Sequence, residues 1–233
     1  MILIISNIAN EAATHLADMF PPGAASLITA TSFNQTFKGG LDVNDFASSQ
    51  IQINGRAVPV GEITGVITTI SSFIPEEFYY IEPADRKYVC AELSAFFIYF
   101  LSQLDCKKIN PPTPRSFSGP NLHRIEWIKK ASAANIPIWP VSMINSKNAN
   151  AEAEKNLKPA VHTFSVLGGK IIGAQQPDLL HKYAMAVQRV FDVPFFTCYF
   201  ISDKAGDYYL ADIVLKPDIN PVANREAIVN YFS

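Results

Sequence analysis

Short apolar runs, separated by polar turns and helix-forming stretches, organise the first half of the chain. Such runs predict buried strands at residues 2–5, 26–28, 65–70 and 107–109. Helical spacing predicts helices at residues 10–19, with Asn10 as the N-cap, and at residues 85–103. Alternating residues around Asn54-Gly55 predict a hairpin over residues 51–58. Strands that alternate with helices indicate an α/β domain with a mostly parallel sheet.

In the second half, strands follow one another more often than they alternate with helices. A helix is predicted at residues 120–134 and a short strand at 137–141, and the polar tract at 145–156 is typical of a linker or an exposed helix. The remaining pattern predicts a hairpin at 163–172, a helix at 178–191, strands at 195–201 and 207–214, and a closing helix at 224–232. This order is typical of a small α+β unit with mainly antiparallel strands.

Composition excludes several classes of function. Hydrophobic residues make up 48% of the chain and charged residues 17%, so the surface is expected to be apolar enough for contact with a partner. The net charge is -2 and no basic cluster is visible, which argues against nucleic-acid binding. The three cysteines are far apart and form no zinc or redox motif. No signal peptide or membrane span is recognised, so we expect a cytoplasmic protein with no membrane partner.

Several residues of the first 142 resemble the ATP-grasp superfamily in their order and spacing, in particular its RimK-like type of peptide-modifying and amino-acid ligases. The family opens with a pre-ATP-grasp domain, a Rossmann-like parallel sheet. The residues that carry the resemblance are Asp85, Arg86, Tyr88, Glu92, Asn110, Pro111, Gly119, Trp127 and Pro137. The resemblance implies an α/β fold with three parts: residues 1–119 as the pre-ATP-grasp-like domain, 120–160 as a connection, and 161–233 as a truncated ATP-grasp-like α+β lobe.

The resemblance resumes after Val161 but leaves little chain for the lobe that holds the nucleotide. In the family this lobe carries two lysines that bind the phosphates. Residues 143–160 are too few for such a lobe. Lys158, in the sequence Leu-Lys-Pro, is the candidate vestige, and Lys170 is a second candidate phosphate ligand. A solvated lysine is the alternative interpretation of Lys158.

The resemblance also suggests metal ligands near the end of the chain. The family supplies an acidic residue and, two positions later, an asparagine, because hard cations such as Mg²⁺ prefer oxygen ligands. One alignment uses Asp212, with Val214 in place of the asparagine. A second uses Asp218 and Asn220. The alternative for Asp218 and Asn220 is a turn that caps the closing helix.

Five residues are expected to brace the joint between the two parts of the chain rather than to act in chemistry: Asp85, Arg86, Glu92, Asn110 and Trp127. Glu92 lies among apolar residues of a predicted helix. A carboxylate on a buried face is costly unless it is paired. Arg86 or Lys87, about one turn earlier, is the expected partner.

The leading hypothesis is therefore a degenerate ATP-grasp-like ligase with no catalytic residues and no cofactor. It would act as a binding or partner component in a ligase or biosynthetic pathway, with a peptide or small molecule as ligand. A homodimer or a partner protein is expected, because loss of the nucleotide lobe would expose apolar surface. The alternative is an active ATP-dependent carboxylate-amine ligase that uses ATP and Mg through a minimal lobe.

Overall fold

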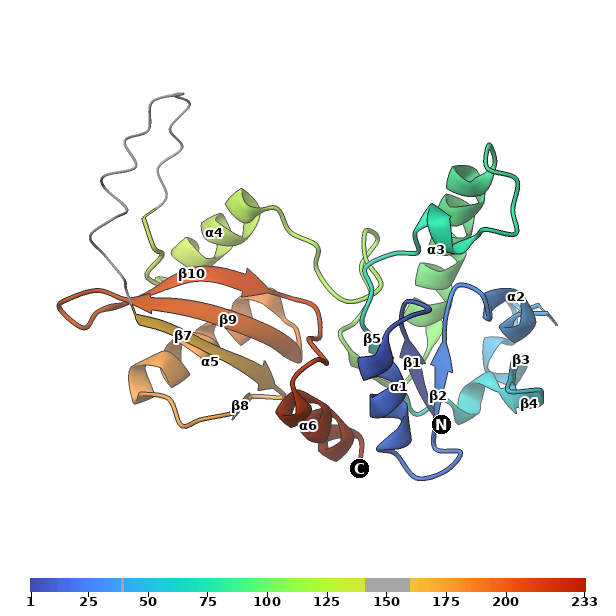
Figure 1. Ribbon diagram of the computed structural model, residues 1–233, viewed down its shortest axis with the longest axis horizontal. Coiled ribbons are helices and arrows are strands. Elements are labelled where there is room, and N and C mark those ends of the chain that lie inside the picture. Colours follow the sequence, from blue (N-terminus) through green and yellow to red (C-terminus); the bar gives the residue numbers. More distant parts are fainter. Residues whose placement is uncertain (39, 141–159) are drawn as a thin grey trace.

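The computed structural model describes residues 1–38, 40–140 and 160–233. The described part contains two four-stranded sheets that lie side by side, and a separate hairpin (Figure 1). In the first sheet the strands are parallel and their order is β2-β1-β5-β6. Their bounds are Ile2–Ile5 (β1), Ala25–Ile28 (β2), Gly65–Thr68 (β5) and Lys107–Ile109 (β6). The predicted parallel α/β sheet is confirmed.

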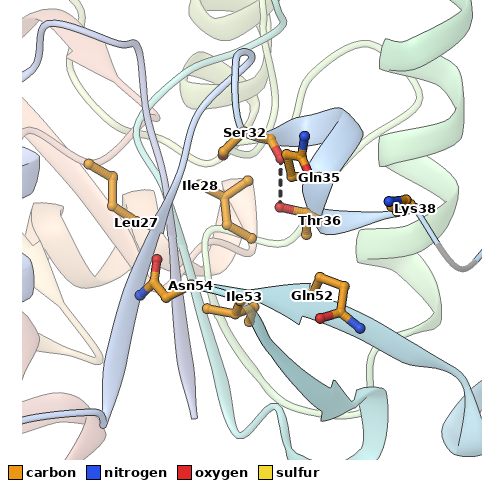
Figure 2. Close-up of a pocket in the computed structure, with 10 residues that line it drawn as sticks. Leu27, Ile28, Ser32, Gln35, Thr36, Lys38, Gln52, Ile53 and Asn54 are labelled. Atoms are coloured by element: carbon orange, nitrogen blue, oxygen red, sulfur yellow. Dashed lines mark hydrogen bonds between the residues drawn. The ribbon is translucent and has the colours of Figure 1, made fainter.

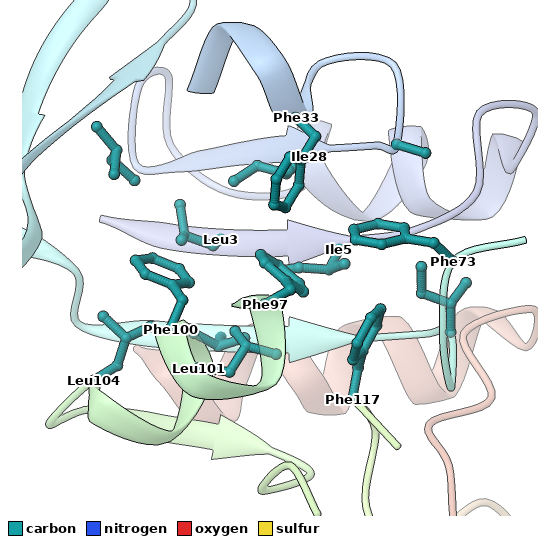
Figure 3. Close-up of a cluster of buried hydrophobic side chains, with 14 of the residues drawn as sticks. Leu3, Ile5, Ile28, Phe33, Phe73, Phe97, Phe100, Leu101, Leu104 and Phe117 are labelled. Carbon is teal, nitrogen blue, oxygen red and sulfur yellow. The ribbon is translucent and has the colours of Figure 1, made fainter. Parts of the chain in front are cut away.

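Both faces of the first sheet are buried, which explains why its strands are apolar at nearly every position. Leu3 and Ile5 point to one face, where they pack with Phe97 and Phe100 of helix α3, Arg86–Gln103 (Figure 3). Ile2 and Ile4 point to the other face and meet helix α1, Glu11–Asp18. Asn10 caps α1 as predicted, because its Oδ1 accepts a hydrogen bond from the Ala13 amide.

The second sheet is antiparallel and has the order β10-β9-β7-β8. Its strands are Ala160–Leu167 (β7), Lys170–Ile172 (β8), Phe195–Ser202 (β9) and Tyr208–Val214 (β10). Helices α4, Arg124–Ala133, and α5, Asp178–Phe191, pack on one face of this sheet. The remaining elements are α2 (Phe33–Thr36), β3 (Gln50–Ile53), β4 (Arg56–Pro59), and three short 3₁₀ turns at Phe46–Ser48, Val60–Glu62 and Pro75–Glu77.

The last helix, α6 at Val222–Phe232, joins the two sheets. Ile228 of α6 belongs to one buried cluster with Ile4 of the first sheet and Phe195 of the second. The fit is close at Gly65 of β5, because a Cβ at this position would lie 2.4 Å from the Phe232 ring. A residue near the C-terminus therefore packs directly on the N-terminal sheet.

Some expected boundaries are wrong. The helix expected at 120–134 begins at Arg124, where the Glu126 carboxylate accepts from the His123 amide and closes the first turn. The strand expected at 137–141 is reduced, within the described residues, to a single bridge between Ile138 and Leu210. The tract at 143–160 lies outside the described residues except for Ala160, which opens β7. No helix in the described ranges is long and apolar enough to cross a membrane.

Candidate functional site

The order of the parallel strands points to one edge of the first sheet. From β1 the chain passes through α1 to β2 on one side, whereas β5 lies on the other side of β1. Ligands in open α/β sheets bind beyond the carboxyl ends of the strands at such a switch point. A cleft of about 390 Å³ lies there. It is lined by Asn7, which follows β1, and by Thr69 and Ile70, which follow β5.

The second sheet supplies the opposite wall of this cleft. Thr197 and Tyr199 of β9 and Val214 of β10 line it, on the face of the sheet that α4 and α5 leave open. The segment after β10 completes the rim with Lys216, Asp218 and Asn220. Thr69 is held in place at the cleft by its hydroxyl, which lies 3.1 Å from the Ile5 carbonyl oxygen and 2.8 Å from the Ser6 hydroxyl.

The wall from the second sheet is held by a network of neutral groups. The hydroxyls of Ser165 and Thr197 lie 2.9 Å apart across β7 and β9. The buried Asn224 amide of α6 donates to Ser165 Oγ at 3.1 Å and to the Asp218 carbonyl oxygen at 2.8 Å. Buried polar groups that are paired in this way fix one arrangement of side chains. The network ties the segment that carries Asp218 to the sheet.

Asn110 holds the two sheets together at the base of the cleft. It follows β6 and is 1% exposed. Its amide donates to the carbonyl oxygens of Phe195 and Leu215, both at 2.7 Å, and its Oδ1 accepts from the Phe195 amide at 2.8 Å. Gly119 makes room for this contact, since a Cβ there would lie 2.9 Å from Asn110 Cβ. The position of Asn110 between the sheets fits its expected bracing role.

The other expected bracing residues are not gathered at the joint. Trp127 lies in the core between α4 and the second sheet. Arg86 lies at the start of α3 and donates to the carbonyl oxygens of Ile81 and Tyr79, at 2.8 and 3.0 Å. Asp85 precedes Arg86 and makes no side-chain cap. Glu92 is exposed rather than buried, and the expected pairing with Arg86 is wrong, because the Arg86 guanidinium is used by the two carbonyls.

The candidate phosphate ligands are not brought to the cleft. Lys158 lies outside the residues that the structure describes. Lys170 lines a different cavity, of about 650 Å³, between β8 and α6. There it shares the wall with Lys107, whose ammonium donates to the Tyr231 carbonyl oxygen at 3.2 Å.

The candidate metal ligands are divided between two places. Asp218 and Asn220 line the cleft, where Asp218 Oδ1 accepts from the Asn220 amide at 3.1 Å. Asp212 is exposed on β10 and does not line the cleft; its Oδ1 accepts from the neighbouring Ile213 amide at 2.8 Å. Within residues 1–38, 40–140 and 160–233, no three His, Cys, Asp or Glu side chains are grouped so that they could hold a metal ion. Of the candidate metal ligands, Asp218 and Asn220 are therefore the two that the cleft brings together.

A larger cavity, of about 670 Å³, lies at the free edge of β2 (Figure 2). Gln35 of α2 and Gln52 of β3 line it with Leu27. Its buried hydroxyl, Thr36 Oγ1, already donates to the Ser32 carbonyl oxygen at 2.9 Å. This cavity is a weaker candidate for the functional site than the cleft, since it lies away from the strand ends where the two sheets meet.

Sequence reasoning missed most of the residues that shape the cleft. Ser165, Thr197 and Asn224 carry no motif, and their roles depend on contacts between distant elements.

The thiol of Cys198 is buried in the second sheet, and burial raises its pKa well above the ordinary value. It is therefore a core residue and not a nucleophile.

Comparison with solved structures places this architecture among ATP-grasp ligases. The macrocyclase MdnC from Microcystis aeruginosa MRC, solved with precursor peptide MdnA, matches with a TM-score of 0.68 at 10% identity, over 100% of this chain and 99% of that chain. The ATP-grasp ligase PsnB, solved with a minimal precursor, Mg and ADP, matches with a TM-score of 0.68 at 9% identity, over 99% and 96% of the two chains. D-alanine-D-alanine ligase from Aeromonas hydrophila matches with a TM-score of 0.56 at 13% identity, over 100% and 94%.

These likenesses establish the fold, as predicted from the sequence. No protein-family model matches the chain, and no curated protein matches it in sequence. The chain therefore has the fold of ATP-grasp ligases, and a shared fold by itself does not assign their activity to it.

Proposed function

We propose that this chain is a degenerate ATP-grasp-like binding protein of the RimK-like type, in which the cleft between the two sheets takes a peptide and no ligation takes place. The observation that carries the proposal is the mainly uncharged lining of the cleft, in which Lys216 and Asp218 are the two charged side chains. Thr69, Thr197, Tyr199 and Asn7 supply hydroxyl and amide groups, which suit the main chain of a peptide.

The same chemistry suits phosphoryl transfer poorly. A carboxylate-amine ligase stabilises the charge on a transferred phosphoryl group with cations and a metal. Lys216 is the single Lys or Arg among the described residues that line the cleft. In one of the two possible alignments Val214, on the cleft wall, stands where the family has an asparagine ligand, and it has no side-chain oxygen. This chain would therefore keep the fold and the cleft of a ligase while it uses them for binding.

The structural neighbours support a peptide as the ligand. MdnC was solved with a precursor peptide, PsnB with a minimal precursor, and a Chryseobacterium gregarium RiPP-associated ATP-grasp ligase with a leader and core peptide. If this chain binds such a peptide without modifying it, it would act beside a separate enzyme in a biosynthetic pathway.

Self-association belongs to the same proposal. Tyr79, which precedes α3, is 67% exposed, and Tyr88, in the first turn of α3, is 69% exposed. Large exposed aromatic side chains are typical of contact surfaces. We expect a homodimer or a complex with a partner protein. Light scattering at several concentrations of the purified chain measures directly whether it forms a homodimer. A monomer at all of these concentrations would count against a homodimer.

The alternative function is an active ATP-dependent carboxylate-amine ligase. It is favoured by the match to MdnC along 99% of that chain and by the presence of Asp218 and Asn220 in the cleft. A coupled assay for ADP release, with Mg-ATP and a pool of peptides, separates the two functions. Turnover that disappears in Asp218→Ala would support the ligase.

Peptide binding is tested with a random peptide library displayed on phage. Selected peptides are synthesised with a fluorophore, and their affinity is measured by fluorescence anisotropy. Val214→Arg places a long charged side chain on the cleft wall, whereas Val43→Arg makes the same change at a position that is 72% exposed and outside the cleft. We expect Val214→Arg to weaken binding at least about 10-fold, equivalent to about 1.4 kcal/mol. Equal affinities for the two variants, both folded by circular dichroism, would place the peptide elsewhere.

A further inference from the structure

A smaller cavity lies beside the cleft, next to the end of β10. Its volume is about 210 Å³. The loop that enters α4 supplies Ser118 and Asn121, α4 supplies Trp127, and the segment after β10 supplies Lys216. Ser71, from the loop after β5, lies on the same wall. The cavity thus gathers side chains from three segments that are distant in sequence.

One of these side chains carries a buried polar group that lacks a hydrogen-bond partner in the described structure. Ser118 is 1% exposed, and its hydroxyl is paired with no group in the described structure. Trp127, which is 4% exposed, lines the same cavity and can offer its indole N–H as a hydrogen-bond donor. A buried polar group without a partner costs about 1–3 kcal/mol. An occupant that accepts a hydrogen bond from the Ser118 hydroxyl would remove that cost.

The available groups select a particular kind of occupant. An indole N–H and a lysine ammonium can only donate hydrogen bonds, so the complementary group must accept them. Lys216 carries the one formal charge among the residues that line the cavity, and no Asp or Glu lines it. A group that only accepts and carries negative charge satisfies all of these partners. An ionised carboxylate has that chemistry.

Size restricts the occupant further. The cavity volume corresponds to about seven water molecules, at about 30 Å³ each. Pockets for drug-sized ligands and cofactors have about 300–1,000 Å³. A whole nucleotide is therefore too large, whereas a carboxylate on one or two carbons fits. The apolar part of such a group would lie against Leu122 and Leu215.

We propose that this cavity is a binding site for a compact carboxylate. The carboxylate accepts hydrogen bonds from the Ser118 hydroxyl and the Trp127 indole N–H and pairs with the Lys216 ammonium. The site shares Val214 and Lys216 with the main cleft, whereas Ser118 and Trp127 line the small cavity and not the cleft. A free short-chain acid and the C-terminus of a peptide present the same group, and the experiment distinguishes them.

The test uses the indole N–H of Trp127 as a reporter. Two-dimensional ¹H–¹⁵N NMR of the full chain shows one indole signal for each tryptophan, and Trp139→Phe identifies the signal of Trp127. Acetate is the probe, and acetamide at equal concentration is the neutral control with the same shape. We expect acetate to shift the Trp127 proton downfield and saturably, and acetamide to leave it in place.

Matched serine variants show whether the cavity is responsible. Ser118→Ala removes the buried hydroxyl, and Ser72→Ala removes an exposed hydroxyl nearby that does not line the cavity. A hydrogen bond to a charged group contributes about 1.5–3 kcal/mol, so Ser118→Ala is expected to weaken acetate binding at least about 10-fold. Ser72→Ala is expected to leave it unchanged. Tri-alanine with a free C-terminus is then compared with acetate, and the tighter ligand identifies the source of the carboxylate.

Three outcomes would overturn the proposal. They are the absence of a saturable shift with both acetate and tri-alanine, an equal shift with acetamide, and equal acetate affinities in the two serine variants. Each would mean that the cavity is not a carboxylate site that uses the Ser118 hydroxyl. Failure of peptide binding in the main cleft remains distinguishable from failure of this proposal, because the readouts at Ser118 and Trp127 belong to residues that do not line that cleft.

Discussion

The contact made by Asn110 gives a sharp prediction about how the two sheets are held together. Asn110→Ala removes three hydrogen bonds of 2.7–2.8 Å that join the end of β6 to Phe195 and Leu215. The main-chain groups left behind lose their partners at a position that is 1% exposed. Because each unsatisfied buried group costs about 1–3 kcal/mol, we expect a loss of about 3–5 kcal/mol in the free energy of unfolding. That is a large part of the 5–15 kcal/mol typical of a folded domain.

The measurement is urea denaturation followed by circular dichroism. Asn44→Ala, at an exposed position in a loop, is the matched control and is expected to change stability by less than about 0.5 kcal/mol. A loss below about 1 kcal/mol in Asn110→Ala would mean that the contact between the sheets does not depend on this side chain.

Asn110→Asp keeps the shape and covers the case in which the alanine variant does not fold. Its carboxylate would still accept from the Phe195 amide, but its other oxygen would face two carbonyl oxygens. These oxygens and burial raise the pKa of the introduced carboxyl in the folded state above its unfolded value of about 3.9. The variant is therefore most stable below the unfolded pKa and loses stability as the pH rises through the folded pKa. A difference from the wild type that is independent of pH would contradict this contact.

Further predictions concern the packing of α6, the thiols and the cleft network. Gly65→Ala places a Cβ 2.4 Å from the Phe232 ring, and we expect it to lower the free energy of unfolding, measured by urea denaturation, by about 1–3 kcal/mol. Gly61→Ala is the control, because its Cβ would meet only the Ala47 carbonyl oxygen at 3.4 Å, and it is expected to have little effect. Cys198 is buried with a raised pKa, so a thiol reagent at pH 8 is expected to modify it only after unfolding; modification in the native protein at the rate of a free thiol would refute its burial. Asn224→Ala breaks the hydrogen bonds to Ser165 and Asp218 and is expected to lower the free energy of unfolding by about 1–3 kcal/mol. Asn230→Ala is the control, because it makes the same truncation at an exposed position of the same helix. Equal stabilities of the two variants would mean that the network does not stabilise the fold.

Much of the fold could be predicted from the sequence, because most elements carry a local signal. β1 and α5 have the predicted bounds, and the Asn54-Gly55 hairpin is present as expected. These elements are specified by short apolar runs, helical spacing and turn residues, which depend on neighbours in the chain. Helix α4 was predicted too long, because Pro120 to His123 precede the helix rather than open it.

Contacts between distant segments could not be read in the same way. Helix α3 is apolar around most of its surface, so its sequence did not reveal that Glu92 faces solvent. The resemblance singled out Asn110, but its partners are 85 and 105 residues away. Ser118 was interpreted only as part of a turn, and its place in a cavity depends on the second sheet. Division of the chain at residues 119 and 160 stays a prediction.

The central claim is that the cleft of this ATP-grasp fold does not hold Mg-ATP, and isothermal titration calorimetry tests it most directly. Titration of a non-hydrolysable ATP analogue with Mg²⁺ into the full chain is expected to give no saturable heat, which means a dissociation constant weaker than about 1 mM or a binding free energy weaker than about -4 kcal/mol. Saturable binding at micromolar concentration that is lost in Asp218→Ala would contradict the account and establish a nucleotide site in the cleft.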